Sequence, residues 1–481
     1  MDHTAAQRLG DLPTAELRRH GHVAVDWVAD YLDRLDMLPV LAQVAPGALR
    51  AALPASPPAV GEDMEAVLAD IDRLIVPATT HWNHPRFFAY FAITGSGPGI
   101  LGELLTAAFN VNGMLWRTSP AATELEQVTL DWLRQMLGLP ATFRGAINDT
   151  ASMSTLHALA AARERRFPAV REEGPDGYGG ARPRVYASEQ AHSSVDKAAI
   201  ALGLGRSAVR RVATDRSFRM DVTSLVRALD EDAGRWTPLA VVATVGTTST
   251  TSVDPVAQIA QVCHERGVWL HVDGAYGGIA AVVPELRWVL EGAEHADSVV
   301  VNPHKWLFTP IDCSAFFVRD PVTLKRAFAL VPEYLRSTEQ DVENYMDWGV
   351  QLGRRFRALK LWMVLRAFGV DGVVRRLREH IRLAQLVADW ADRHPEFERL
   401  APAPLSTVCL RARFHGVTVA EADRRNAALL EAVNATGHAY LSHTELYGRY
   451  VLRLAVGNLR TTEADVRSTL ALLEREAERL R

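Results

Sequence analysis

Four segments of the sequence place a side chain that could do chemistry after a run of apolar residues. Asp273 follows VWLHV, and Lys305 follows SVVV within the segment NPHKW. Thr248 comes after AVVATV, and His192 comes shortly after RVYAS. A carboxylate and a lysine at strand ends are costly to bury unless they are paired or functional. For any single Asp–Lys pair, a structural ion pair is the simplest interpretation.

A site for pyridoxal phosphate explains the same residues together. A lysine amine binds the aldehyde of this cofactor, a carboxylate keeps its pyridine nitrogen protonated, and a helix N-terminus binds its phosphate. The segment NDTAS, residues 148–152, precedes the helical run MSTLHALAAARERR and could be that N-terminus. Taken alone, this segment is also typical of an ordinary helix cap.

A metal-dependent hydrolase is the alternative class, because His271, Asp273, His295, Asp297 and His304 are metal ligands by residue type. However, the sequence has no HExxH pair, no GxSxG elbow, and no GxGxxG or Walker loop after a strand. Cofactor chemistry is therefore favoured over metal or nucleotide chemistry, and a non-catalytic binding module ranks third.

The central part of the chain must position these residues. It alternates β-rich runs such as ARPRVYAS, LAVVATVGTT and VWLHVDGAYGG with helical runs such as HSSVDKAAIALG and PVAQIAQVCHERG. Short apolar strands separated by helices predict a parallel sheet buried on both faces. Ligands bind beyond the carboxyl ends of such strands, where the polar residues are found.

The flanking segments predict two smaller units. Apolar residues recur at helical spacing from Leu17 to Leu35, and prolines between Pro39 and Pro58 then prevent a continuous helix. This first helix needs a partner, either a second subunit or its own domain. From Gln351 onward, two helical runs, two β-rich runs and a last helix predict a small α+β domain.

Composition restricts the class of protein. The 481 residues are 48% hydrophobic and 23% charged, as in ordinary globular proteins. The formal net charge of -4 argues against nucleic acid and anionic membranes as partners and leaves small molecules as the default. The three cysteines form no CxxC pair, and we find neither a signal peptide nor an apolar run of about 20 residues. We therefore expect a cytoplasmic protein.

The segment HVDGAYGG, with the lysine of NPHKW 32 residues after its aspartate, resembles the group II pyridoxal-phosphate-dependent decarboxylases. The resemblance extends over nearly the whole chain and is strongest to the aromatic-L-amino-acid decarboxylases. The motifs that carry it, in order, are HWNHPRFFAYF, SPAATELE, EQAHSSVDKA, ATVGTT, NPHKWLF, PEYL and LGRRFRALKLW. It implies a lyase that converts tryptophan, phenylalanine, tyrosine or dihydroxyphenylalanine to the amine and CO2.

The resemblance also implies an α/β protein of PLP-dependent transferase fold type I. The expected parts are an N-terminal helical dimerisation segment (1–95), a large cofactor-binding domain with a mostly parallel seven-stranded sheet (96–362), and a small C-terminal α+β domain (363–481). A homodimer with active sites at the subunit interface is implied as well.

Residue roles follow from matching the family motifs. Lys305 would bind the cofactor aldehyde and Asp273 the pyridine nitrogen, while His192 and Ala275 would cover opposite faces of the ring. Thr248 would lie near the phenolic oxygen. The phosphate would be held by Thr150, Ala151, Ser152, Asn302 and His304.

Tyr334 lies in the polar segment VPEYLRSTEQD. In the family, the matching tyrosine comes over the active site and donates a proton to the substrate Cα. Relatives that form aldehydes replace this tyrosine or the stacking histidine. Both Tyr334 and His192 are present, which favours decarboxylation over the alternative of an aromatic aldehyde synthase. A decarboxylase of a non-aromatic amino acid is the other alternative.

The same resemblance implies a substrate pocket. It would comprise Trp82, Tyr90, Phe91, Ala92, Ile93 and Ile311, with Asn112 and Met114 from the other subunit. Animal dihydroxyphenylalanine decarboxylases have Pro-Thr where this chain has Ala92-Ile93, so a hydroxyl contact is lost and the aromatic substrates are not ranked. The pocket offers no obvious arginine for a second carboxylate, which disfavours glutamate. Arg354, Arg355 and Arg357 are expected in ion pairs with the large domain.

Overall fold

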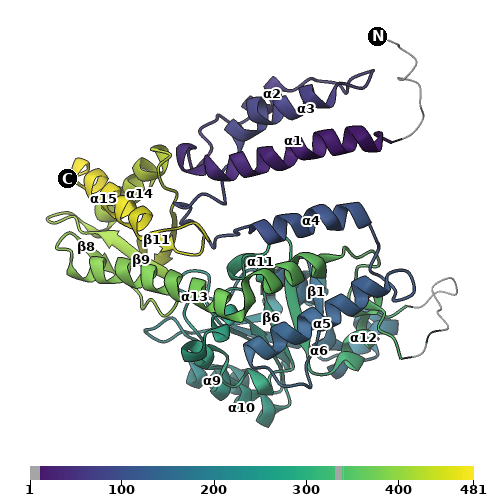
Figure 1. Cartoon of the computed structure of the whole chain (residues 1–481). Helices are drawn as coiled ribbons and strands as arrows, with labels where there is room; N and C mark the ends of the chain where they lie inside the picture. The colour runs from purple at the N-terminus through teal and green to yellow at the C-terminus, as the bar shows by residue number, and fades with distance from the viewer. Residues whose placement is uncertain (1–10, 331–338, 340) are drawn as a thin grey trace.

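The computed structural model describes residues 11–330, 339 and 341–481 (Figure 1). The N-terminal part contains α1 (Thr14–Asp33), α2 (Ala48–Ala52) and α3 (Met64–Asp70). The predicted first helix is thus confirmed, and only the short α2 forms within the proline-rich segment. In Figure 1, α1–α3 lie together, away from the large sheet. Three apolar side chains of α1, those of Leu17, Val23 and Val25, are exposed in the single chain.

The large domain is built on seven strands. They are β1 (Arg144–Asn148), β2 (Pro183–Ser188), β3 (Val209–Val212), β4 (Thr237–Thr244), β5 (Trp269–Asp273), β6 (Ser298–Val301) and β7 (Ser314–Val318). Their order is β1-β7-β6-β5-β4-β2-β3, with β7 antiparallel to both neighbours and the other pairs parallel. The predicted mostly parallel seven-stranded sheet is confirmed.

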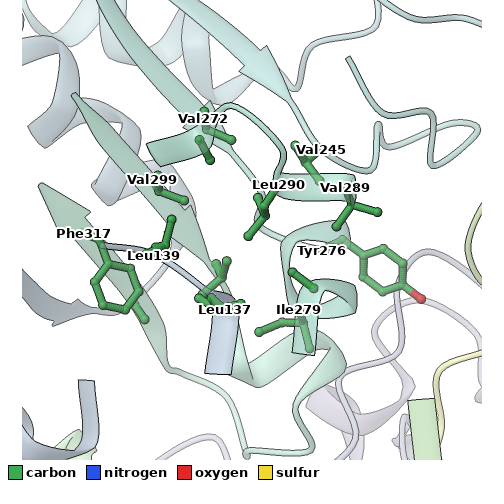
Figure 2. Packing of buried hydrophobic residues seen from close by; sticks show 14 of the residues in the cluster. Leu137, Leu139, Val245, Val272, Tyr276, Ile279, Val289, Leu290, Val299 and Phe317 are labelled. Carbon is green, nitrogen blue, oxygen red and sulfur yellow. The ribbon is translucent and has the colours of Figure 1, made fainter. Parts of the chain in front are cut away.

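Helices cover both faces of this sheet. The helices of this part of the chain are α4 (Gly97–Phe109), α5 (Pro120–Leu137), α6 (Ala151–Arg166), α7 (Val170–Glu173), α8 (Ser194–Ala201), α9 (Val222–Asp232), α10 (Val256–Arg266), α11 (Pro303–Trp306) and α12 (Pro321–Phe328). Side chains of one strand alternate between two apolar clusters. Val272 and Val299 pack with Leu137 and Leu290 on one face, as Figure 2 shows, while Val300 belongs to the cluster on the other face. Burial on both faces explains why the strand sequences are almost continuously apolar.

The C-terminal part begins with the long α13 (Arg357–Arg393). Gly369 interrupts it with φ 63° and ψ 169°, so the two helical runs read from the sequence meet at this residue. A four-stranded antiparallel sheet follows, in the order β10-β11-β9-β8, and α14 and α15 pack with it. The bounds are β8 (Phe397–Arg399), β9 (Thr407–Ala412), α14 (Val419–Ala435), β10 (Ser442–Leu446), β11 (Arg449–Ala455) and α15 (Glu463–Arg479). The small α+β domain is confirmed, and the expected boundary after residue 362 falls within α13.

Within the described residues, none of the helices has the length and apolar character that a membrane crossing requires.

Candidate active site

A cavity of about 240 Å³ lies at the carboxyl ends of β4, β5 and β6. It is lined by Phe91, Thr150, Ala151, Ser152, His192, Thr244, Gly246, Thr248, Asp273, Ala275, Tyr276, Asn302, His304 and Lys305. All ten residues that the resemblance assigns to the cofactor are therefore brought together. The strand-end argument explains why, because β4, β5 and β6 are parallel and end at the same edge of the sheet.

Asp273 and Lys305 supply the two opposite charges of this cavity. Asp273 is buried at the end of β5, directly beside Thr244 of β4, and its carboxylate accepts a hydrogen bond from the Ala275 N–H at 3.1 Å. Lys305 lies in α11, immediately after β6. Burial lowers the pKa of Lys305, the Arg453 charge acts in the same direction, and Asp273 opposes both. A lowered pKa increases the fraction of neutral amine, the form that attacks an aldehyde.

The N-terminus of α6 forms the anion-binding side. Thr150 is the N-cap residue, but its hydroxyl donates to Asp149 at 3.3 Å and leaves the helix uncapped. Ala151 and Ser152 line the cavity at the positive end of the helix dipole. Their backbone N–H groups have no hydrogen-bond acceptor within the helix. A phosphate group matches this set of donors.

Two polar atoms of the cavity wall have no partner. The Oδ1 atom of Asn302 and the Oγ1 atom of Thr244 are buried and make no hydrogen bond with the described residues. Unpaired polar atoms are costly inside a protein. Together with the uncapped helix, they indicate that the cavity fits a polar, anionic ligand such as pyridoxal phosphate.

Two histidines border the cavity, one buried and one with an exposed side chain. Nδ1 of His304 accepts the Cys313 N–H at 2.9 Å, and burial lowers the pKa of His304 to about 3, so this ring is neutral and carries its proton on Nε2. His192 lies at the mouth with an exposed side chain, and its Nδ1 accepts the Ser194 N–H at 3.2 Å. The protein atoms packed around the ring lower the pKa of His192, which favours the neutral form.

Sequence reasoning missed several residues of this region, among them Tyr276 and Arg453. Tyr276 lines the cavity and stacks on Phe91 with ring centroids 3.7 Å apart. Arg453, from β11, is buried and donates to the carbonyl oxygens of Ser249 and Tyr90. The structure shows no carboxylate partner for it among the described residues. An arginine inside the apolar run YVLRLAVGN was the available signal, because a charge in a buried strand is costly unless it has a role.

The expected substrate residues do not all converge on the cavity in one chain. Phe91 alone of the eight lines it. Nearby, the rings of Trp82 and Tyr90 stack with centroids 6.0 Å apart. Ala92 is buried, Ile93 is half-buried and Ile311 is exposed. The side chain of Asn112 contacts the Met114 sulfur at 3.4 Å, and the contribution of this pair to a second subunit stays a prediction.

The remaining sequence predictions have different outcomes. Tyr334 lies outside the described residues. The three arginines do form ion pairs, Arg354 with Glu126 at 2.7 Å, Arg355 with Glu103 at 2.6 Å and Arg357 with Asp312 at 2.7 Å. The first two precede the helix in which they were expected, since α13 begins at Arg357.

The metal-site alternative finds no support. No three His, Cys, Asp or Glu side chains cluster as a metal site in the part of the chain that the structure describes. The His295 side chain is exposed, and Asp297 pairs with Arg165 at 2.7 Å before the start of β6, at the opposite end from the cavity.

The fold and the cavity define a PLP-dependent enzyme of fold type I. The chain belongs to the pyridoxal-dependent decarboxylase family, whose conserved domain matches residues 46–413. Its cofactor is pyridoxal phosphate, and it is a carboxy-lyase.

Known proteins are similar over nearly the full length of this chain. Tyrosine decarboxylase 4 of Petroselinum crispum is 39% identical, over 100% of this chain and 98% of the relative. Phenylacetaldehyde synthase of a Rosa hybrid cultivar is 38% identical, over 95% of this chain and 92% of the relative. The solved structure of Oryza sativa TDC with PLP and tryptamine has a TM-score of 0.94 at 38% identity, covering 98% of this chain and 99% of that one. The relatives thus include aromatic amino acid decarboxylases and aldehyde synthases.

Proposed function

We propose that this protein decarboxylates an aromatic L-amino acid to the corresponding amine and CO2. The observation that carries the proposal is the convergence of Lys305, Asp273, His192 and the uncapped start of α6 on one cavity. The aromatic rings of Phe91 and Tyr276 form an apolar part of its wall, which suits an aromatic side chain. The names of the relatives support the same substrate class.

Ten of the residues that line the cavity have a proposed role toward the cofactor. Lys305 holds the cofactor aldehyde, Asp273 keeps the pyridine nitrogen protonated, and His192 and Ala275 contact opposite ring faces. Thr248 lies near the phenolic oxygen. The phosphate is held by Thr150, Ala151, Ser152, Asn302 and His304.

The bound cofactor supplies an electron-accepting ring for the electron pair that remains at the substrate Cα when CO2 departs. Asp273 sustains this property, because a buried carboxylate stabilises the positive charge of a protonated ring nitrogen. His192, at the cavity mouth, would orient the substrate carboxylate for its departure as CO2.

Two residues favour the amine over the aldehyde as product. We assign to Tyr334 the role of donating a proton to the substrate Cα, because it matches the family tyrosine. His192 is the second residue that aldehyde-forming relatives replace. Aromatic aldehyde synthesis stays the second candidate because relatives with that activity are about as similar as the decarboxylases.

We further propose a homodimer with active sites at the subunit interface. The apolar side chains of Leu101, Leu104 and Phe109 on α4 are exposed in the single chain, as are those of Leu17, Val23 and Val25 of α1. Apolar patches of this kind mark interaction surfaces. A second subunit would also bring Asn112 and Met114 to the neighbouring site. Cytoplasmic localisation remains an expectation from the sequence.

The substrate class can be tested with the PLP-loaded protein and an equimolar mixture of L-tryptophan, L-phenylalanine, L-tyrosine, L-dihydroxyphenylalanine, L-glutamate and L-2,4-diaminobutyrate. Mass spectrometry then measures which amino acids are consumed. Consumption of one or more aromatic members with glutamate untouched supports the proposal. Exclusive consumption of glutamate or diaminobutyrate would refute the aromatic assignment.

A further inference from the structure

His380, on the second half of α13, makes two buried hydrogen bonds that fix its tautomer. The Trp306 Nε1–H donates to Nδ1 of His380 at 3.0 Å, and Nε2 of His380 lies 3.0 Å from the carbonyl oxygen of Asn458. Tryptophan has only a donor and a carbonyl only accepts. His380 must therefore be neutral with its proton on Nε2, and burial, which lowers the pKa of His380 to about 4, maintains this state.

One end of this hydrogen-bonded chain leads to the cofactor lysine. Trp306 is the residue after Lys305 and closes the four-residue helix α11. Its ring stacks on Tyr276 with centroids 4.7 Å apart and planes inclined by 7°, and Tyr276 in turn stacks on Phe91. Trp306 thus connects His380 to two aromatic side chains of the cavity wall. Since α11 is only one turn long, its own backbone hydrogen bonds fix it weakly.

The other end leads to the segment expected to bind the substrate. The side-chain amide of Asn458 is fully buried and donates to the carbonyl oxygens of Trp82 at 3.1 Å and His84 at 3.0 Å. The chain from Trp306 through His380 and Asn458 to Trp82 therefore joins the lysine helix, the small domain and the N-terminal segment.

His380 also supports Phe308, the second residue after α11. Its ring packs edge-on against Phe308, with centroids 5.8 Å apart. Phe308 has φ 57°, a left-handed conformation that costs energy for a residue other than glycine and persists only when its surroundings hold it. The Phe308 carbonyl accepts the Ser96 N–H at 3.2 Å, which provides a second connection to the segment after Phe91.

We infer that His380 is a positioning residue, which sets the geometry of Lys305 relative to the substrate segment through Trp306, Phe308 and Asn458. His380 is not among the residues that line the cavity. The inference rests on the proposed role of Lys305, but its consequence for cofactor binding does not depend on which amino acid is the substrate. Loss of the imidazole should loosen α11 and so weaken binding of pyridoxal phosphate.

The test compares His380→Phe, which keeps a ring but makes neither hydrogen bond, with His380→Gln, whose amide can both accept and donate. Apoprotein is titrated with pyridoxal phosphate below the unfolding temperature, and the affinity and the visible circular dichroism of the bound cofactor are measured. We expect His380→Phe to lower the affinity about tenfold and change the dichroism, as the loss of buried hydrogen bonds should. His380→Gln should stay within about threefold of the wild type.

Two further variants separate positioning from general destabilisation. Trp306→Phe removes one partner of the same hydrogen bond, so the double variant with His380→Phe should bind the cofactor no more weakly than His380→Phe alone. Trp269→Phe is the matched control, because it removes the 3.0 Å hydrogen bond between another buried indole and Ser298. It should lower the melting temperature without changing the cofactor affinity.

Wild-type affinity and dichroism in both His380→Phe and Trp306→Phe, with only a lower melting temperature, would overturn the inference. Failure of every variant and of the wild type to bind pyridoxal phosphate would instead contradict the proposed function.

Discussion

Arg453 and Lys305 approach the same aromatic ring. The Arg453 Cζ atom lies 4.5 Å from the centroid of Phe91, and the Lys305 Nζ atom lies 5.3 Å from it. The two cations therefore share one aromatic neighbour in a buried region where Asp273 is the opposing charge. This arrangement makes the neutral form of the lysine more accessible than it would be in water.

Replacement of Arg453 should slow the capture of the cofactor. Because its charge lowers the pKa of Lys305, Arg453→Met should raise that pKa and reduce the neutral amine at a given pH. The rate at which apoprotein forms the yellow holoenzyme, measured against pH, should then reach its midpoint at a higher pH. Arg453→Lys should keep the wild-type profile. The control is Arg411→Met, another buried arginine, which pairs with Asp423 at 2.8 Å; a shift of equal size in this variant would show that the effect is not electrostatic.

Lys305→Ala should abolish covalent attachment of pyridoxal phosphate. Borohydride treatment followed by mass spectrometry should find no cofactor fixed to the chain, and turnover should fall by at least about 10³-fold, as when a covalent catalyst is removed. Lys325→Ala provides the control, since that lysine forms an ion pair with Glu343 at the surface of α12. Undiminished turnover of Lys305→Ala would show that another residue holds the cofactor.

Asp273→Asn should retain the cofactor and lose activity. The amide oxygen can still accept the Ala275 N–H, so the local turn is kept, but the negative charge that stabilises a protonated pyridine nitrogen is gone. We expect kcat to fall about 10²- to 10³-fold, the size of effect seen when one preorganised electrostatic contact is removed. A kcat within a few-fold of the wild type would refute the assigned role.

His157 should contribute to the instability of the protein in acid. Burial lowers the pKa of His157 to about 3, whereas an unfolded chain binds this proton near pH 6.5. The unfolded state therefore takes up more protons between these values, and stability falls as the pH drops from 6.5 toward 3. His157→Phe should reduce the slope of unfolding free energy against pH in this window by about 1.4 kcal/mol per pH unit. Urea unfolding of both proteins at a series of pH values measures the slope, and equal slopes would contradict the prediction.

The cofactor side of the cavity was largely predictable from the sequence. Asp273, Lys305 and the helix that begins at Ala151 each lie at or after the end of a short strand, and the sheet brings such strand ends together. The interruption of α13 at Gly369 was also predictable, because two helical sequence patterns meet there. These features depend on local sequence patterns, and the fold brings the corresponding segments together.

The substrate side was not predictable in the same way. Arg453 and His380 reach the region from the small domain, and a single arginine in a strand or a single histidine in a helix has no spacing that identifies its partner. The placement of Asn112 and Met114 in the site of a second subunit stays a prediction, because local sequence patterns contain no geometric information about a second subunit. The positions of these residues depend on packing between segments that are distant in the sequence. Hydrophobic periodicity does not encode such packing.

The ratio of products to CO2 tests most directly the central claim that this protein converts an aromatic L-amino acid to the amine. The PLP-loaded protein is incubated with the aromatic L-amino acid that it consumes fastest, and CO2, amine, aldehyde and hydrogen peroxide are quantified in one reaction. We predict one amine for each CO2, with neither aldehyde nor peroxide formed. Aldehyde and peroxide in place of the amine would contradict the account and identify an aldehyde synthase.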